Sequence, residues 1–179
     1  MSLLPIRIFP DPVLRQKAEK VIDFTPELTT LITHMVDTMY DAPGIGLAAP
    51  QIGESIRLIV VDISEEEDEQ NSMVMINPEI TTQEGKQVDE EGCLSVLDLT
   101  ASVKRSLKVT VSYQDAEGTP QELSAEERFA IVLQHEIDHL NGILFLDHLS
   151  TLKRALYKKK VKKQQQAAAK KKLASNEKK

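Results

Sequence analysis

Two histidines stand four residues apart in "QHEIDHL" (134–140), and a glutamate follows the first of them. On a helix, His135 and His139 project from one face, so the two rings can share a metal ion. Glu136 is turned about a third of a turn away, and its carboxylate can therefore reach water near the ion without binding the ion itself. The spacing predicts a metal site that carries out hydrolysis.

A third protein ligand is expected, because a catalytic site of this kind keeps one position open for water. Metzincin peptidases extend the motif to H-E-x-x-H-x-x-G-x-x-H, and here Gly142 fits but Phe145 occupies the last position. Peptidases that use a glutamate further along the chain would find only Glu177. Asp147 and His148 are nearer and stay open as alternatives. The pattern therefore argues against a metallopeptidase.

Cys93, in "DEEGCLSV", is an upstream candidate for the third ligand. A metal ion deprotonates a thiol, and cysteine with two histidines and one water makes a catalytic set. Gly92 and the acids Asp89, Glu90 and Glu91 in front of it predict a turn that leaves a strand, where a thiol would be accessible. Inert packing is the alternative interpretation of a single cysteine.

The stretch "GIGLAA" (44–49) matches the glycine pattern of dinucleotide-binding folds. Such a site needs a strand, a glycine turn and a helix in that order. Here a predicted helix precedes the glycines, and Pro50 prevents a helix directly after them. Gly44 and Gly46 are better explained as positions where the backbone turns or approaches a ligand closely.

The helix that carries the two histidines is the most clearly marked element of the chain. Ser124 and Glu127 predict a capping box at its start, and Asn141-Gly142 predicts its end. Periodicity predicts the elements around it: a helix over 25–44 that Thr25 caps, strands over 56–63 and 72–78, and a hairpin of 107–115 with 119–123. The elements do not alternate as βαβ units, so the expected fold class is α+β.

Composition places the chain among globular proteins of one domain, or of one domain and a tail: it has 179 residues, of which 41% are hydrophobic. No run approaches the roughly 18 apolar residues of a membrane span, and the start resembles neither a secretory signal nor a transit peptide. A single cysteine fits a reducing compartment. We therefore expect a cytoplasmic protein, with neither a membrane nor DNA as a partner.

The net charge of −6 conceals an uneven distribution. Residues 153–179 hold 12 bases against one acid, a charge of +11, and the other residues hold 10 bases against 27 acids, a charge of −17. We expect a helix from about residue 149 into this basic tail, which either contacts a polyanion or serves as a solubilising end. The acidic stretch "SEEEDEQN" (64–71) predicts a solvated loop.

Three segments together resemble the peptide deformylases: "GIGLAAPQ" (44–51), "EGCLS" (91–95) and "QHEIDHL" (134–140), in this order. The resemblance implies antiparallel β-sheets packed around a central metal-binding helix. It implies a catalytic domain over 1–150, followed by a basic helical tail over 151–179. It also implies an enzyme that removes the formyl group from the N-terminal formyl-methionine of nascent polypeptides and releases formate.

The resemblance extends to the reacting groups. Cys93 and the two histidines would hold one metal ion, typically Fe²⁺, with zinc or nickel able to take its place. Glu136 would carry the proton that water loses and the departing amine gains. The side-chain amide of Gln51 and the backbone N–H of Leu94 would stabilise the oxyanion.

The resemblance also implies how the peptide binds. The methionine side chain would enter a pocket that includes Ile45, Ile131 and Val132. The backbone of Gly44 and Gly46 would pair with the peptide in an extended conformation.

Two positions depart from the family pattern: Leu97 stands where proline is usual, and Thr100 replaces a basic or aromatic residue. Both would border the peptide channel, so they bear on peptide preference. An alternative is a catalytically silent relative that binds ribosomes or formyl-peptides. The tail would suit contact with ribosomal RNA, which the family can make through a C-terminal helix.

Overall fold

A computed structural model of the chain describes residues 3–64 and 71–176, with side chains up to residue 169. Most of the acidic stretch predicted as a loop, residues 65–70, lies outside the described residues. The chain forms two compact units, Met1–Phe145 and Leu146–Lys179. The elements, in chain order, are η1 (Pro12–Arg15), α1 (Pro26–Asp41), β1 (Gly46–Ala48), η2 (Ala49–Ile52), β2 (Leu58–Val61), β3 (Met73–Glu84), β4 (Gln87–Cys93), β5 (Val96–Arg105), β6 (Lys108–Gln114), β7 (Pro120–Glu126), α2 (Glu127–Leu140), η3 (Phe145–His148) and α3 (Thr151–Asn176).

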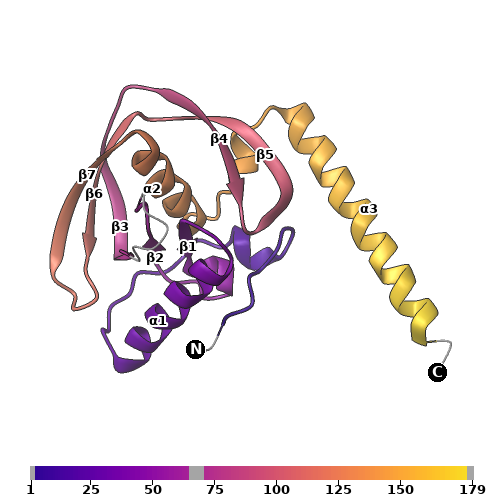
Figure 1. Ribbon diagram of the computed structural model, residues 1–179, viewed down its shortest axis with the longest axis horizontal. Coiled ribbons are helices and arrows are strands. Elements are labelled where there is room, and N and C mark those ends of the chain that lie inside the picture. Colours follow the sequence, from indigo (N-terminus) through magenta and orange to yellow (C-terminus); the bar gives the residue numbers. More distant parts are fainter. Residues whose placement is uncertain (1–2, 65–70, 177–179) are drawn as a thin grey trace. The chain divides into compact units, whose positions relative to one another are not determined.

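The first unit is built from two antiparallel sheets and two α-helices (Figure 1). One sheet has five strands in the order β1-β2-β3-β6-β7, and the other is the hairpin β4-β5. All of the strand pairs are antiparallel. Helix α2 lies in the middle of the unit, surrounded by the strands (Figure 1). The predicted α+β fold, with antiparallel sheets around a central helix, is confirmed.

Strand β2 shows why the five-stranded sheet sits between two helices. Its sequence, Leu-Ile-Val-Val, is buried throughout, and alternate side chains of a strand point to opposite faces. Ile59 and Val61 belong to one apolar cluster, whose helical members come from α2: Ala130, Val132, Leu133, Ile137 and Leu140. Leu58 and Val60 belong to a second cluster, whose α-helical members come from α1: Leu28, Ile32, Met35 and Met39. Each face of the sheet is therefore covered by one helix.

Helix α1 begins as the sequence predicts. The side-chain oxygen of Thr25 accepts a hydrogen bond from the backbone N–H of Leu28 at 3.4 Å, and Pro26 is the first helical residue. Proline suits this position because the first backbone N–H groups of a helix have no partner within the helix. The apolar face of the helix, with Leu28, Ile32, Met35 and Met39, packs against the sheet.

The predicted start of α2 was wrong. Ser124 lies in β7 opposite Thr110, and the helix begins at Glu127, with no capping bond from the side chain of Glu126. The reason is that β6 and β7 stay paired as far as Lys108 and Glu126, so the residues of the proposed capping box complete a sheet edge instead. The predicted end was right, because α2 ends at Leu140 before Asn141 and Gly142.

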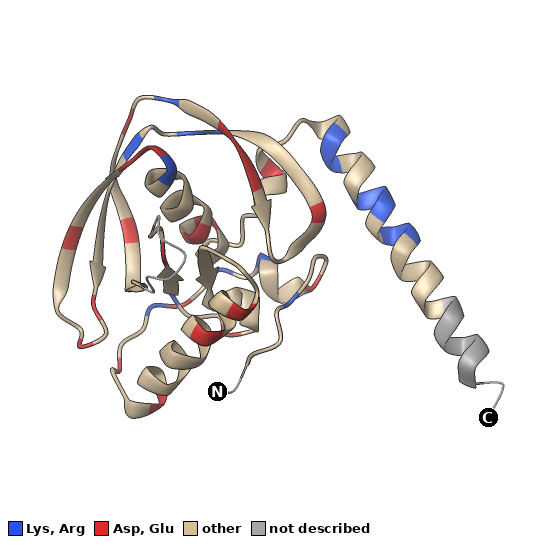
Figure 2. Cartoon of the chain, in the orientation of Figure 1, with Lys and Arg blue, Asp and Glu red and all other residues tan. Residues whose placement is uncertain are grey.

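The second unit contains α3, which begins near the predicted position and carries the basic tail. Among its described side chains, Lys158, Lys159, Lys160, Lys162 and Lys163 are exposed. Figure 2 shows the blue positions along the first turns of this helix. Over the described residues, none of the helices combines the length and the apolar character that crossing a membrane requires.

Candidate metal centre and active site

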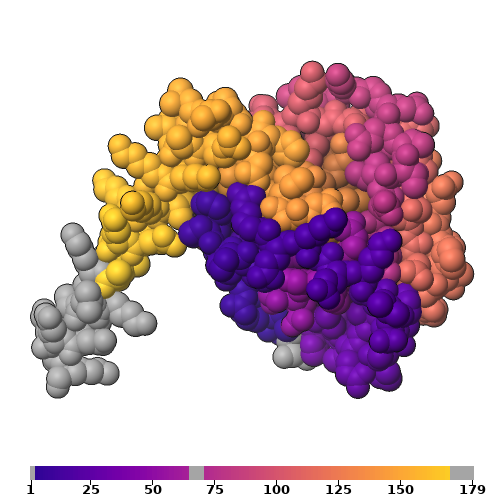
Figure 3. Space-filling model, turned by 180° about the vertical axis from the view of Figure 1, so that it is seen from behind, coloured from indigo at the N-terminus to yellow at the C-terminus, as the bar shows by residue number. Residues whose placement is uncertain are grey.

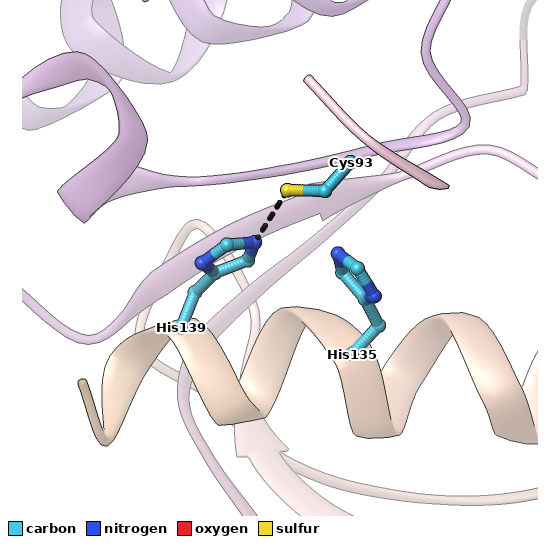
Figure 4. Close-up of side chains that lie close together, drawn as sticks. All are labelled: Cys93, His135 and His139. Carbon is cyan, nitrogen blue, oxygen red and sulfur yellow. Dashed lines mark hydrogen bonds between the residues drawn. The ribbon is translucent and has the colours of Figure 1, made fainter. Parts of the chain in front are cut away.

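Cys93, His135 and His139 come together at the centre of the first unit. Cys93 is the last residue of β4, and the histidines project from successive turns of α2 (Figure 4). One ligand atom from each residue lies within 4.8 Å of the others, and Sγ of Cys93 is 3.3 Å from Nε2 of His139. Cys93, rather than Asp147 or His148, completes this group, which in the described part of the chain is the one set that could hold a metal ion.

The chemistry of this donor set fits a catalytic metal. A thiolate and two imidazoles suit zinc and iron, and three protein ligands leave one position for water or substrate. Burial lowers the pKa of His139 well below its ordinary value, so its ring is neutral and able to bind a cation. Phe145, which stands where a metzincin has its third histidine, packs its ring against that of His135 at a centroid distance of 6.0 Å.

A buried carboxylate orients His135. Oε2 of Glu91 lies 2.8 Å from Nδ1 of His135, which leaves Nε2 of the ring for the metal. Burial alone would raise the pKa of Glu91, but hydrogen bonds from His135 and Arg105, together with their charges, outweigh it and hold the pKa at about 2. Burial would likewise lower the pKa of His135, yet its contacts with Cys93 and Glu91 raise it well above its ordinary value.

Arg105 extends this arrangement into a buried chain of ion pairs. Its Nε lies 2.8 Å from Glu91, and its Nη1 lies 2.5 Å from Asp138 on α2. The guanidinium therefore joins β4, β5 and the metal-binding helix. This network was not predicted from the sequence: Glu91 was expected in a turn, whereas it lies within β4. In the sequence, the one sign of this network is an acidic residue, Glu91, two positions before Cys93. That spacing does not indicate that Glu91 pairs with His135 and Arg105.

Glu136 occupies the position expected of a proton carrier. Its side chain is 5% exposed and lines a cavity that is described below. Its Oε2 has no hydrogen-bond partner among the described residues. Burial raises the pKa of this carboxyl to about 7. A group that exchanges protons near neutral pH is suited to act first as base and then as acid.

Gly46 makes room for this carboxylate. A Cβ atom at Gly46 would lie 2.5 Å from Oε1 of Glu136, closer than such atoms approach in proteins. The sequence predicted that the backbone at Gly46 turns or approaches a ligand closely. In the structure, the group that lies close to Gly46 is the side chain of Glu136. At Gly44, a Cβ atom would lie 2.9 Å from Cδ1 of Leu94.

Gln51 is buried beside the cysteine. Its Oε1 accepts a hydrogen bond from the backbone N–H of Ala48 at 2.7 Å, and its Nε2 lies 3.7 Å from Sγ of Cys93 and 3.2 Å from Oγ of Ser95. From its residue type alone, Gln51 would have been assigned to the surface.

A cavity of about 880 Å³ opens onto this group. Its walls include each residue for which the sequence predicted a substrate or oxyanion contact: Gly44, Ile45, Gly46, Gln51, Leu94, Ile131 and Val132. Leu97 and Thr100, which depart from the family pattern, also line it. The cavity therefore brings the predicted site residues around one space with Glu136 and His135 in its wall.

Comparisons with known proteins agree with this geometry. A model of the polypeptide deformylase family matches residues 3–155. The peptide deformylase of Desulfotalea psychrophila is 62% identical over 162 residues, which cover 90% of this chain and 96% of that protein. The peptide deformylase of Brucella suis is 50% identical over 161 residues, which cover 89% and 92% of the two chains.

Solved structures extend the likeness to the fold. A peptide deformylase from Legionella pneumophila superposes with a TM-score of 0.85 at 48% identity, over 94% of this chain and 98% of that one. One from Synechococcus elongatus, solved in complex with actinonin, gives a TM-score of 0.83 at 42% identity, over 88% of this chain and 86% of that one. On these grounds the chain belongs to the polypeptide deformylase family.

Proposed function

We propose that this protein removes the formyl group from the N-terminal formyl-methionine of nascent polypeptides and releases formate. The observation that carries this proposal is a buried carboxylate, Glu136, beside the Cys93, His135 and His139 group in the wall of one cavity. Water is the second reactant, and the products are formate and a peptide with a free amine. The side chains that the proposed hydrolysis uses argue against a catalytically silent relative: Cys93, His135, His139, Glu136 and Gln51.

Cys93, His135 and His139 would hold one metal ion, and we propose Fe²⁺, with zinc or nickel able to take its place. When bound, the ion supplies Lewis acidity, which acidifies water and polarises a carbonyl. Glu136 takes a proton from the attacking water on its carboxylate and later gives it to the departing amine nitrogen. Its pKa of about 7 and its Oε2, for which the described part of the chain offers no hydrogen-bond partner, support both steps.

The oxygen of the formyl group gains negative charge during the attack and needs hydrogen-bond donors. We assign this part to Nε2 of Gln51 and to the backbone N–H of Leu94, which flank Cys93 and line the cavity. Donors that are already in place stabilise such a charge without reorganisation during the reaction.

Strand β1 supports a binding mode for the peptide. It is an edge strand that pairs with β2 on one side, so the backbone at Gly44 and Gly46 can pair with an extended peptide on the other. Ile45, Ile131 and Val132 line the cavity and would form the apolar pocket for the methionine side chain.

The reaction is tested by measuring formate released from a formyl-Met tripeptide. The protein is loaded with Fe²⁺ under anaerobic conditions, and Glu136→Ala serves as the control. We expect steady turnover by the wild type and a loss of roughly 10²–10⁴-fold in the variant, the range of general acid–base catalysis. If wild type and variant release formate at the same rate, the proposed function is wrong.

We assign catalysis to residues 1–150, and we propose that the basic tail, residues 151–179, brings the enzyme to cytoplasmic ribosomes, where its substrate emerges. The exposed lysines of α3 support this role. When lysine side chains contact RNA phosphates, counterions are released from the RNA, and this release favours binding. Deleting residues 158–179 should leave turnover of a short formyl-Met peptide intact and weaken ribosome binding in a salt-dependent way. Unchanged affinity for ribosomes would exclude this role.

A further inference from the structure

We infer that Ser95 is a positioning residue for the proposed deformylation and that it acts through the carboxamide of Gln51. The inference rests on the proposed function, in which Gln51 stabilises the oxyanion. Ser95 lies in the turn between β4 and β5, two residues after Cys93, and is fully buried at 0% exposure. Its Oγ accepts a hydrogen bond from Nε2 of Gln51 at 3.2 Å.

The direction of the Gln51 amide is fixed by the backbone. Its Oε1 accepts the N–H of Ala48 at 2.7 Å, and a flipped amide would place its NH₂ group against that N–H, donor against donor. Nε2 is therefore committed to the side of Ser95 and Cys93. One of its two protons is donated to Oγ of Ser95, and the other is donated in a long hydrogen bond of 3.7 Å to Sγ of Cys93, which lines the cavity together with Gln51.

One hydrogen bond sets which way an amide faces but leaves its plane able to rock. The second bond, to Ser95, holds the plane, so that the remaining N–H keeps one direction. A donor contributes most to catalysis when its direction is set before the charge develops. Ser95 would therefore affect the rate without touching the substrate.

The backbones of the two residues are held by one further segment. The N–H of Arg7 donates to the carbonyl of Gln51 at 2.6 Å, and the N–H of Phe9 donates to the carbonyl of Ser95 at 2.8 Å. Arg7 and Phe9 are alternate residues of the N-terminal stretch, whose indigo atoms spread over one face of the first unit in Figure 3. The N-terminal stretch therefore fixes the backbones of both residues, which keeps the side chains of Gln51 and Ser95 in contact.

The first test separates Ser95→Ala from Ser95→Thr in zinc-loaded protein. Ser95→Ala removes the acceptor, so kcat for formate release should fall about tenfold while KM stays within about twofold, the pattern of an interaction made in the transition state. Ser95→Thr keeps the hydroxyl and adds a buried methyl group, so it should lose stability yet retain kcat. Ser102→Ala, an exposed serine of the same hairpin, is the matched control and should change neither. A Ser95→Ala enzyme with wild-type kcat overturns the inference.

A double-mutant cycle tests whether Ser95 acts through Gln51. In a Gln51→Ala background, Ser95→Ala should cost no further rate, because the group that it positions is gone. Losses that multiply would instead give Ser95 an independent role and refute the positioning role.

A readout that does not depend on turnover is hydrogen exchange of the Gln51 side-chain NH₂ group in zinc-loaded protein, assigned by NMR with Gln51→Ala. We expect slow exchange in the wild type and exchange at least about tenfold faster in Ser95→Ala. Fast exchange in the wild type contradicts the inference even if no variant folds. A wild type that releases no formate but shows the slow exchange contradicts the proposed function and leaves the Ser95 contact standing.

Discussion

Glu91 and His135 form the contact on which the metal centre depends, because Oε2 of the carboxylate lies 2.8 Å from Nδ1 of the ring. The bond sets which nitrogen of His135 faces Cys93 and His139. Arg105 binds the same carboxylate and also binds Asp138, so the helix that carries the two histidines and the β4-β5 hairpin are joined next to His135. Such partners of a ligand histidine fix its tautomer and its orientation.

Replacing Glu91 by glutamine should weaken metal binding. The variant keeps the size of the side chain but removes the charge that orients His135, and we expect a loss of about 10–100-fold in Zn²⁺ affinity. Competition against a chromogenic chelator measures it. Glu90→Gln is the matched control, because Glu90 is the exposed neighbour on the same strand and should leave the affinity unchanged. Equal affinities for the Glu91 variant and the wild type would remove Glu91 from the metal site.

Glu136 should destabilise the metal-free protein as the pH rises. Burial raises the pKa of this carboxyl from 4.5 in the unfolded chain to about 7 in the folded one. A group with a raised folded-state pKa contributes its full stability below pH 4.5 and loses it as the pH passes through 7. Glutamine cannot ionise. In urea denaturation, Glu136→Gln should therefore show a free energy of unfolding about 3 kcal/mol higher than that of the wild type at pH 8, and a similar one near pH 4.

Glu122→Gln serves as the control for this comparison, since Glu122 is exposed on β7. It should shift the urea midpoint by the same small amount at both pH values. A Glu136→Gln protein that is no more stable than the wild type at pH 8 would mean that the buried carboxylate is solvated or paired in solution.

The two ligand histidines were predictable because a local rule links them: a spacing of four on a helix puts both on one face. The network beneath them was not. Glu91 and Arg105 lie on the two strands of the β4-β5 hairpin but are not cross-strand partners, since Glu91 pairs with Ala101 and Arg105 with Gln87, so no local spacing rule links them. The prediction that Ser124 caps the helix was wrong for a related reason, because the pairing between β6 and β7 places Ser124 in a strand. Residue type alone misplaced Gln51, whose burial depends on the turn at η2.

Alanine at Gly46 should impair catalysis more than alanine at Gly44. At Gly46 the new Cβ would meet Oε1 of Glu136 at 2.5 Å, inside a packed site, whereas at Gly44 it would meet the end of the flexible Leu94 side chain at 2.9 Å. Displacing a catalytic group by about 1 Å can cost roughly 10²-fold in rate, and we expect that loss in kcat/KM for Gly46→Ala. For Gly44→Ala we expect a loss in kcat/KM that is about tenfold smaller.

The metal content of both glycine variants should match that of the wild type, which separates a displaced Glu136 from a damaged metal centre. Adding Glu136→Ala to Gly46→Ala removes the obstructing side-chain atoms and should recover thermal stability, although not activity. A double variant as unstable as Gly46→Ala alone would show that the clash lies elsewhere.

Removing the metal should lower the melting temperature, and Cys93→Ser should abolish most of that response. A ligand present at 100 times its Kd stabilises the folded state by about 2.7 kcal/mol, which for a protein of this size corresponds to roughly 5–10 °C in Tm. Serine is a poor ligand where a thiolate bound, so Cys93→Ser with and without Zn²⁺ should melt within about 2 °C. His34→Ala, which removes a histidine outside the Cys93, His135 and His139 group, should keep the full metal-dependent shift. Scanning calorimetry of the three proteins, before and after chelation, measures the effect, and an undiminished shift in Cys93→Ser would exclude the thiol as a ligand.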